Sequence, residues 1–197
     1  MRYITLLIAT LFSLSLSAQS FKKTICDHRK EYKEGFKEEG SPLKPDEIRY
    51  LKFYKPDEAY QVTADFKRTF GEKPFDMVTS SGKKKRYVKY GELSFELKGT
   101  AITLAVYQSL KLMSMPQYKE YLFLPFKDST NGQETYSAGR YIDLEMSDIK
   151  NDKVTLDFNK TYNPYCAYTT GYNCPYPPAE NHLTMPIYAG EKMFGKK

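Results

Sequence analysis

The middle of the sequence alternates between apolar and polar residues, which is the pattern of a β-strand with one buried face. Residues 92–98 and 101–107 each place three apolar side chains on the same side. Gly99 and Thr100 separate the two segments, and a two-residue step of this kind predicts a hairpin turn. The sequence therefore predicts an antiparallel hairpin at the centre of the fold.

Further strands are predicted by the same alternation or by short apolar runs. Residues 121–126 are apolar on both faces, which indicates a central strand, and Pro125 marks its end or a bulge. The other predicted strands are residues 60–66, 140–146, 153–158 and 183–188, of which the second and third are expected to pair with each other.

A helix is predicted near the N-terminus, over residues 20–39. Its apolar and aromatic residues recur at helical spacing: Phe21, Ile25, Tyr32 and Phe36. A second, short helix is expected over residues 45–51, because a proline opens its first turn. Together with the strands, this predicts a mainly β fold, either an antiparallel β-sandwich or a partly closed barrel, with the N-terminal α-helix packed on it.

The first 18 residues have the features of a secretory signal peptide. Arg2 precedes an apolar stretch from Ile4 to Leu16, and small residues precede Gln19. The stretch is shorter than the roughly 20 residues of an ordinary membrane helix, and the alternative is a buried N-terminal helix. We therefore expect export to the periplasm or the cell exterior, no membrane span, and a single globular domain over residues 19–197.

The charge of the chain limits its partners. The net charge of +6 favours contact with anionic surfaces or glycans, and export argues against nucleic acid. Four consecutive basic residues, 83–86, follow a Ser-Ser-Gly turn. They predict a solvated hairpin tip rather than a binding patch.

Three cysteines are present: Cys26, Cys166 and Cys174. Cys166 and Cys174 are the expected disulfide, since the residues between them can turn the chain back and an exported protein is oxidised. Closing this loop stabilises a fold by about 2.6 kcal/mol on the chain-entropy model. Cys26 is then left as a free thiol or an intermolecular link. A zinc site of Cys166, Cys174 and His182 is the alternative, but it lacks a fourth ligand, so no metal and no cofactor are expected.

The first of two polar clusters spans residues 128–141. Arg140 shares a strand face with Ile142 and Leu144, so its guanidinium is expected to point inward and to need a carboxylate partner. Asp128 and Glu134 are the candidates. Either the pair fixes the loop as a structural ion pair, or the guanidinium binds a ligand carboxylate or phosphate.

The second polar cluster spans residues 157–181 and contains both paired cysteines. Its polar residues lie near turns stiffened by proline: Asp157, Asn159, Asn163, Glu180 and Asn181. Such side chains often bond exposed backbone groups, and they can also line a ligand site.

Sequence signatures of common catalytic sites are missing, including a phosphate loop, a nucleophile elbow and a metalloprotease helix. His182 is the one plausible general base. A hydrolase that uses two carboxylates among Asp128, Glu134, Asp157 and Glu180 remains an alternative, since two carboxylates in different environments can divide acid and base roles. Whether the chain is an enzyme stays open.

The two polar clusters, residues 126–141 and 157–181, resemble those of the prokaryotic family called domain of unknown function 1684. Residues 91–99 and 41–43 are also similar to the family, so the resemblance covers nearly all of the chain after residue 18. It implies that these positions are signature residues and implies no established activity. It also argues against catalysis by His182, since members of the family usually carry another residue there.

The expected function is binding of a polar or anionic ligand in a pocket between the two clusters. Arg140 would orient the ligand, and nearby carboxylates would hold Arg140. The expected site residues are Asp128, Glu134, Tyr136, Arg140, Asp157, Asn159, Asn163, Glu180 and Asn181. The expected ligand is a polar small molecule, a glycan or a peptide of the cell envelope. The alternatives are a paired-carboxylate hydrolase and a structural domain without a ligand site.

Overall fold

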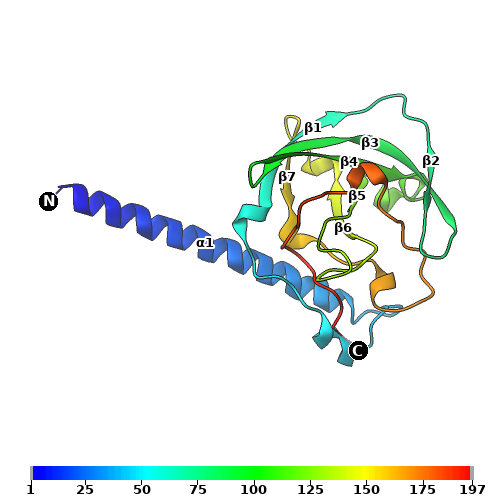
Figure 1. The fold of residues 1–197 in the computed structure, drawn as a ribbon, viewed down its shortest axis with the longest axis horizontal. Helices are drawn as coiled ribbons and strands as arrows, with labels where there is room; N and C mark the ends of the chain where they lie inside the picture. Colours follow the sequence, from blue (N-terminus) through cyan, green and yellow to red (C-terminus); the bar gives the residue numbers. More distant parts are fainter. Residues whose placement is uncertain (1, 196–197) are drawn as a thin grey trace.

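One antiparallel sheet of seven strands forms the body of the protein in the computed structural model (Figure 1). The structure describes residues 2–195, with side chains from residue 19 onward. The strands follow the order β6-β5-β4-β3-β1-β7, with β2 paired to β3, and the sheet curls into a half-barrel. The predicted mainly β fold with a partly closed barrel is therefore confirmed.

The bounds of the elements are as follows. The strands are β1 Gln61–Arg68, β2 Phe75–Val78, β3 Lys84–Leu97, β4 Thr100–Ser109, β5 Tyr121–Phe126, β6 Arg140–Glu145 and β7 Lys153–Asp157. The α-helix α1 spans Arg2–Gly35. The short 3-10 helices are η1 Pro45–Tyr50, η2 Glu58–Tyr60, η3 Leu112–Ser114, η4 Pro116–Tyr118, η5 Met146–Asp148, η6 Phe158–Lys160, η7 Tyr165–Ala167 and η8 Ala179–Asn181.

The predicted central hairpin is formed by β3 and β4, but its turn lies one residue earlier than predicted. Leu97 pairs with Thr100, so Lys98 and Gly99 make the turn. Their φ angles are 50° and 78°, the left-handed values that a type I′ turn needs at both central positions. The glycine therefore occupies the second turn position, because it adopts such a φ without strain.

A bulge in β3 bends the sheet. The pairing with β4 shifts by one residue between Lys89 and Gly91, which leaves Tyr90 without an opposite partner. A side chain at Gly91 would meet the ring of Phe66 at 2.5 Å. The glycine therefore lets the neighbouring strand approach closely at the point where the bulge increases the local twist.

Strands β6 and β7 lie at opposite edges of the sheet, so the prediction that they pair with each other is wrong. β6 pairs with β5, and β7 pairs with β1. The connection reverses on itself, because Asn151 and Asp152 have positive φ angles and Lys150 bridges to Lys153. This turn starts β7, which then pairs with β1.

The predicted strand at residues 183–188 is absent from the sheet, and that prediction is also wrong. Among the described residues, this part of the chain makes only isolated bridges at its ends, including one between Lys127 and His182. Its backbone bonds partly to the backbone of residues 127–129 and partly to the side chains of Arg140 and Asp128. The alternation of apolar residues therefore reflects which side chains are buried here, and it does not indicate that the segment pairs with a strand.

Apolar side chains pack on both faces of the sheet. The cluster inside the curl includes Leu93, Leu104 and Leu124. A second cluster on the outer face includes Tyr107 and Phe123, so β5 is buried on both faces as predicted. The segment around Pro175 covers the outer cluster, where it bridges to Thr79 and accepts a hydrogen bond from the hydroxyl of Tyr141.

The C-terminal half of α1 packs on the body of the protein (Figure 1). Ile25 and Phe36 are buried, as the predicted stripe requires, although the helix ends at Gly35 instead of residue 39. The predicted signal peptide, residues 1–18, lies outside the part of the chain with described side chains. Among the described residues, no helix is long and apolar enough to cross a membrane.

Candidate functional site

Arg140 is fully buried and holds the C-terminal segment. Its guanidinium pairs with Asp128 at 2.8 Å, which is one of the two carboxylates expected from the sequence. It also donates to three backbone carbonyls, those of Ile187 at 2.9 Å, Ala189 at 2.5 Å and Glu191 at 3.1 Å. A side chain thus supplies the hydrogen bonds that a neighbouring strand would otherwise give. Both terminal nitrogens of the guanidinium bond to protein groups, Nε has no partner among the described residues, and the side chain does not face solvent.

Asn181 completes the ladder between β4 and β5. In the register set by Tyr107 and Phe123, Ala105 lies opposite Pro125, which has no N–H to donate. The side chain of Asn181 accepts from the N–H of Ala105 at 2.7 Å and donates to the carbonyls of Ala105 and Pro125 at 2.8 Å each. The side-chain amide of Asn181 therefore supplies the donor that Pro125 lacks and bonds both peptide groups of this step in the ladder.

Asp157 and Asn159 also bond backbone. Asn159 exchanges two hydrogen bonds with the backbone of Asp57, and Asp157 accepts from the N–H and the side chain of Asn159. Asp157 accepts a further bond from Gln61 at 3.2 Å. These contacts fix the chain that leads into β1 against the end of β7. Both residues also line the groove described below.

Three other expected site residues lie apart from one another. Glu134 is exposed and pairs with Lys192 at 3.0 Å. Glu180 pairs with Lys89 at 2.8 Å and accepts from the hydroxyl of Tyr107 at 2.6 Å. Tyr136 donates to the carbonyl of Cys166 at 3.3 Å. Of the four carboxylates considered for a hydrolase, only Asp157 lines the groove.

The cysteines of the second cluster are bonded to each other. Cys166 and Cys174 form the expected disulfide, and Cys26 is a free, exposed thiol on α1. His182, which completed the alternative zinc set, is exposed and hydrogen-bonds through Nε2 with the carbonyl of Pro177 at 3.0 Å. The disulfide closes the loop that forms one end of the groove.

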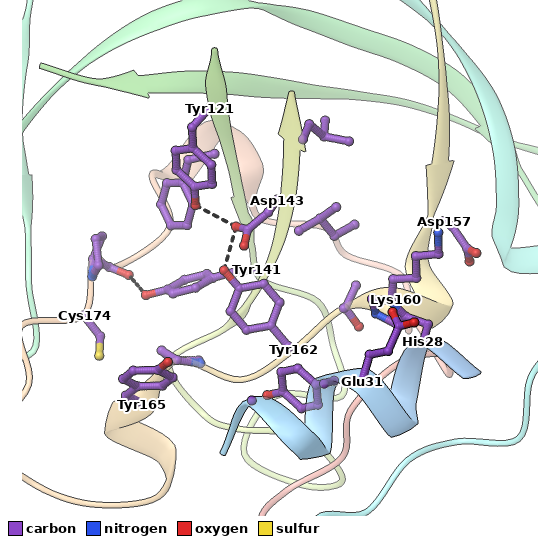
Figure 2. Close-up of a pocket in the computed structure, with 18 of the residues that line it drawn as sticks. His28, Glu31, Tyr121, Tyr141, Asp143, Asp157, Lys160, Tyr162, Tyr165 and Cys174 are labelled. Atoms are coloured by element: carbon purple, nitrogen blue, oxygen red, sulfur yellow. Dashed lines mark hydrogen bonds between the residues drawn. The ribbon is translucent and has the colours of Figure 1, made fainter. Parts of the chain in front are cut away.

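The groove lies between α1 and the outer face of the sheet near its β6 edge (Figure 2). Its volume is about 1020 Å³, at the upper end of the range of small-molecule sites. His28 and Glu31 reach it from α1, and Tyr121 and Asp143 reach it from β5 and β6. Residues 159–175 supply much of the remaining wall, and Asp157 at the end of β7 adds to it.

Asp143 lies at the centre of this groove. It points outward from β6, because the alternating neighbours Ile142 and Leu144 point into the core. Its Oδ1 atom accepts hydrogen bonds from the hydroxyls of Tyr121 and Tyr162, each at 2.6 Å (Figure 2). Within the described part of the chain, no group donates to Oδ2. The two tyrosines therefore fix the orientation of a carboxylate whose second oxygen has no donor among the described residues.

The surroundings of Asp143 disfavour its charge. The side chain keeps contact with solvent through the groove, but protein atoms crowd around it, and this burial raises the pKa of Asp143. The hydrogen bonds from Tyr121 and Tyr162 act in the opposite direction. Burial likewise raises the pKa of Tyr162 well above its usual value, so the tyrosine remains a neutral donor.

Glu191 is a second carboxylate that sequence reasoning missed. It is fully buried and joins three parts of the chain. Its carboxylate accepts from the hydroxyl of Tyr32 on α1 at 2.9 Å, from the hydroxyl of Tyr168 at 2.7 Å and from the N–H of Asn163 at 2.9 Å. Burial raises the pKa of Glu191 to about 7, although these hydrogen bonds oppose the shift.

Glu191 is expected to make the stability depend on pH. The folded protein holds this proton more tightly than the unfolded chain, whose carboxyl titrates near 4.5. Raising the pH from 4.5 through about 7 should therefore lower the free energy of unfolding by up to about 3 kcal/mol. Denaturation at several pH values tests this. Glu191→Gln, which keeps a neutral acceptor, should flatten the profile, and an unchanged profile in this variant contradicts the assignment.

The comparisons with known proteins identify the family. The family model described as "Protein of unknown function (DUF1684)" matches residues 46–192. The chain belongs to this family. The resemblance seen in the sequence is thereby confirmed, and the match includes Asp128, Arg140, Asp143, Asn181 and Glu191. A search of curated proteins found no match.

A solved structure supports the fold. The solution NMR structure of an uncharacterized protein from Haloarcula marismortui is 33% identical in sequence, with a TM-score of 0.68. The similarity covers 89% of this chain and 96% of that chain. The fold is thus shared with that protein over most of both chains.

Neither Asp143 nor Glu191 had a distinctive sequence context. One feature of the sequence points to Asp143. It lies on the same predicted strand as the inward-facing Arg140 but on the opposite, outward face. Its tyrosine partners lie 22 and 19 residues away in the sequence, so their convergence depends on the fold. Glu191 follows the last apolar run and resembles any surface glutamate in sequence.

Proposed function

We propose that this protein is a binding domain that takes a small polar ligand into the groove between α1 and the outer face of β5 and β6. The observation that carries the proposal is the carboxylate of Asp143. Two tyrosine hydroxyls hold it in place, and its second oxygen is left for a donor on the ligand. A group oriented in advance loses little entropy on binding, which favours affinity.

The lining of the groove supports binding of an organic molecule. Aromatic rings surround Asp143, among them Tyr87, Phe123, Tyr141 and Tyr162. Apolar walls with a few fixed polar groups are typical of ligand pockets. Binding is favoured over hydrolysis, since the carboxylates considered for acid and base roles have separate protein partners.

The proposal keeps part of the site expected from the sequence. Asp157 and Asn159 line the groove, and the disulfide of the second cluster closes one end of it. Arg140 and Asp128 contribute by holding the C-terminal segment. The disulfide also supports our proposal that the domain works in an oxidising compartment outside the cytoplasm.

A ligand screen tests the proposed function. Amines, sugars, cell-envelope glycan fragments and short peptides are added to ¹⁵N-labelled protein, and amide shifts are followed by NMR. We expect at least one class to shift the amides of Tyr121, Asp143 and Tyr162, and Asp143→Ala to abolish these shifts. A screen in which every binding compound shifts residues elsewhere contradicts the proposal.

A further inference from the structure

The groove is acidic although the chain is basic. The whole chain has a net charge of +6. The groove is lined by five carboxylates, Glu31, Glu38, Asp143, Asp148 and Asp157, and by only three Lys or Arg side chains, Arg29, Lys85 and Lys160. A concave surface whose sign opposes that of the protein attracts ligands of positive charge.

Asp143 has no cationic partner in the described part of the chain. It forms no ion pair with any described residue, and its two hydrogen-bond donors are neutral tyrosines. By contrast, the buried carboxylate of Asp128 is paired with Arg140 at 2.8 Å. Asp143 is reached by solvent, yet the protein around it raises its pKa, and a cation bound at Oδ2 would favour its charged form.

The rings beside Asp143 suit the same kind of ligand. Tyr121 and Tyr162 are partly exposed beside Asp143, whereas Phe123 and Tyr141 are 4% and 6% exposed. Tyr141 packs edge-to-face against Tyr162 at 5.8 Å and against Phe123 at 4.7 Å. Both neighbours and Tyr141 line the groove. Aromatic faces attract cations through the ring quadrupole, and cages of such rings recognise alkylated ammonium groups. A strongly hydrated metal ion would gain less from rings, so the observations favour an organic cation.

We propose that the group recognised in this groove is the ammonium of a small organic cation, with Asp143 as its counter-ion and the partly exposed rings of Tyr121 and Tyr162 beside it. This inference rests on the proposed function and specifies the chemical class of the ligand. The Oδ2 atom of Asp143 would face the ammonium, while Oδ1 keeps its bonds to Tyr121 and Tyr162.

Choline and its uncharged isostere 3,3-dimethyl-1-butanol test the inference, because they share a shape and differ in charge. Each is titrated into the labelled protein, and amide shifts give the dissociation constant. We expect choline to bind at least about tenfold more tightly than the alcohol, since the alcohol can form neither the ion pair with Asp143 nor a cation–π contact. The shifts should centre on Tyr121, Asp143 and Tyr162.

Two variants separate the role of Asp143 from the general charge of the groove. Asp143→Asn keeps the shape and should remove the preference for choline. Glu31→Gln removes the same charge from α1 in the same groove and should leave most of the preference. An unshifted thermal midpoint and a dispersed amide spectrum show that Asp143→Asn is folded.

The outcomes distinguish the inference from the proposed function. Equal binding of choline and the alcohol, or a preference that survives in Asp143→Asn, overturns the ammonium inference and leaves groove binding intact. Absence of choline binding at millimolar concentration, with a neutral compound bound at Asp143, overturns it as well. Compounds that bind only away from Asp143 overturn both.

Discussion

Arg140→Ala is expected to lower the free energy of unfolding by about 3–5 kcal/mol, because it leaves Asp128 as a buried charge without its partner. The same change removes the donor to the carbonyls of Ile187, Ala189 and Glu191. The C-terminal segment would then lose the side chain that substitutes for a neighbouring strand. Urea denaturation followed by circular dichroism measures the loss.

Arg86→Ala is the matched control for this experiment. Arg86 lies on the β2–β3 hairpin with 61% of its side chain exposed, so its removal should change the free energy of unfolding by no more than about 0.5 kcal/mol. A loss below about 1 kcal/mol in Arg140→Ala contradicts the structural role of the arginine. Loss of ligand binding with an unchanged free energy of unfolding would instead indicate that Arg140 belongs to the binding site.

Asn181→Ala is expected to lower the free energy of unfolding by about 4 kcal/mol. Three buried backbone groups on Ala105 and Pro125 lose their partner, and each unsatisfied group is worth roughly 1–3 kcal/mol. The damage should be local to the β4–β5 ladder. Hydrogen exchange tests this, because the amide of Ala105 should lose protection more than the amides of the β1–β7 pair.

Asn173→Ala serves as the control in the same loop. Its side chain accepts a hydrogen bond from Ser81 at the surface, so its removal should cost about 1 kcal/mol or less. Equal losses in the two variants, or an unchanged exchange rate at Ala105, would show that Asn181 does not complete the ladder.

The fold was largely predictable where local pattern and local structure coincide. β5 spans Tyr121–Phe126 as predicted, because a strand buried on both faces is apolar along its whole length. The β3–β4 hairpin was predictable because its turn is short, although the glycine had to occupy the second turn position. The apolar stripe of the helix through Ile25 and Phe36 was predictable because helical spacing places these residues on one buried face.

The errors arose where long-range contacts decide the structure. Residues 183–188 alternate like a strand, but their backbone bonds to residues 127–129 and to the side chains of Arg140 and Asp128 instead of to a strand of the sheet. β6 and β7 are consecutive and alternate, yet the turn at Asn151 and Asp152 sends them to opposite edges. Sequence periodicity reports which face is buried and not which strand lies beside it.

The candidate site was only partly readable from the sequence. The inward direction of Arg140 and its pairing with Asp128 were predictable, because a buried charge requires a partner. The groove was not predictable, since α1, β5, β6 and the segment after β7 meet only in the folded protein. The residues that look most distinctive in sequence, such as Asn181, replace backbone hydrogen bonds, whereas Asp143 has an ordinary sequence context.

The most direct measurement is an NMR map of a bound organic cation on the intact domain. Contacts from the ammonium methyl protons of choline to the rings of Tyr121 and Tyr162, lost in Asp143→Asn, are the predicted result. Contacts instead to residues around Arg140 and Ala189, or contacts that persist in the variant, would contradict a ligand site centred on Asp143.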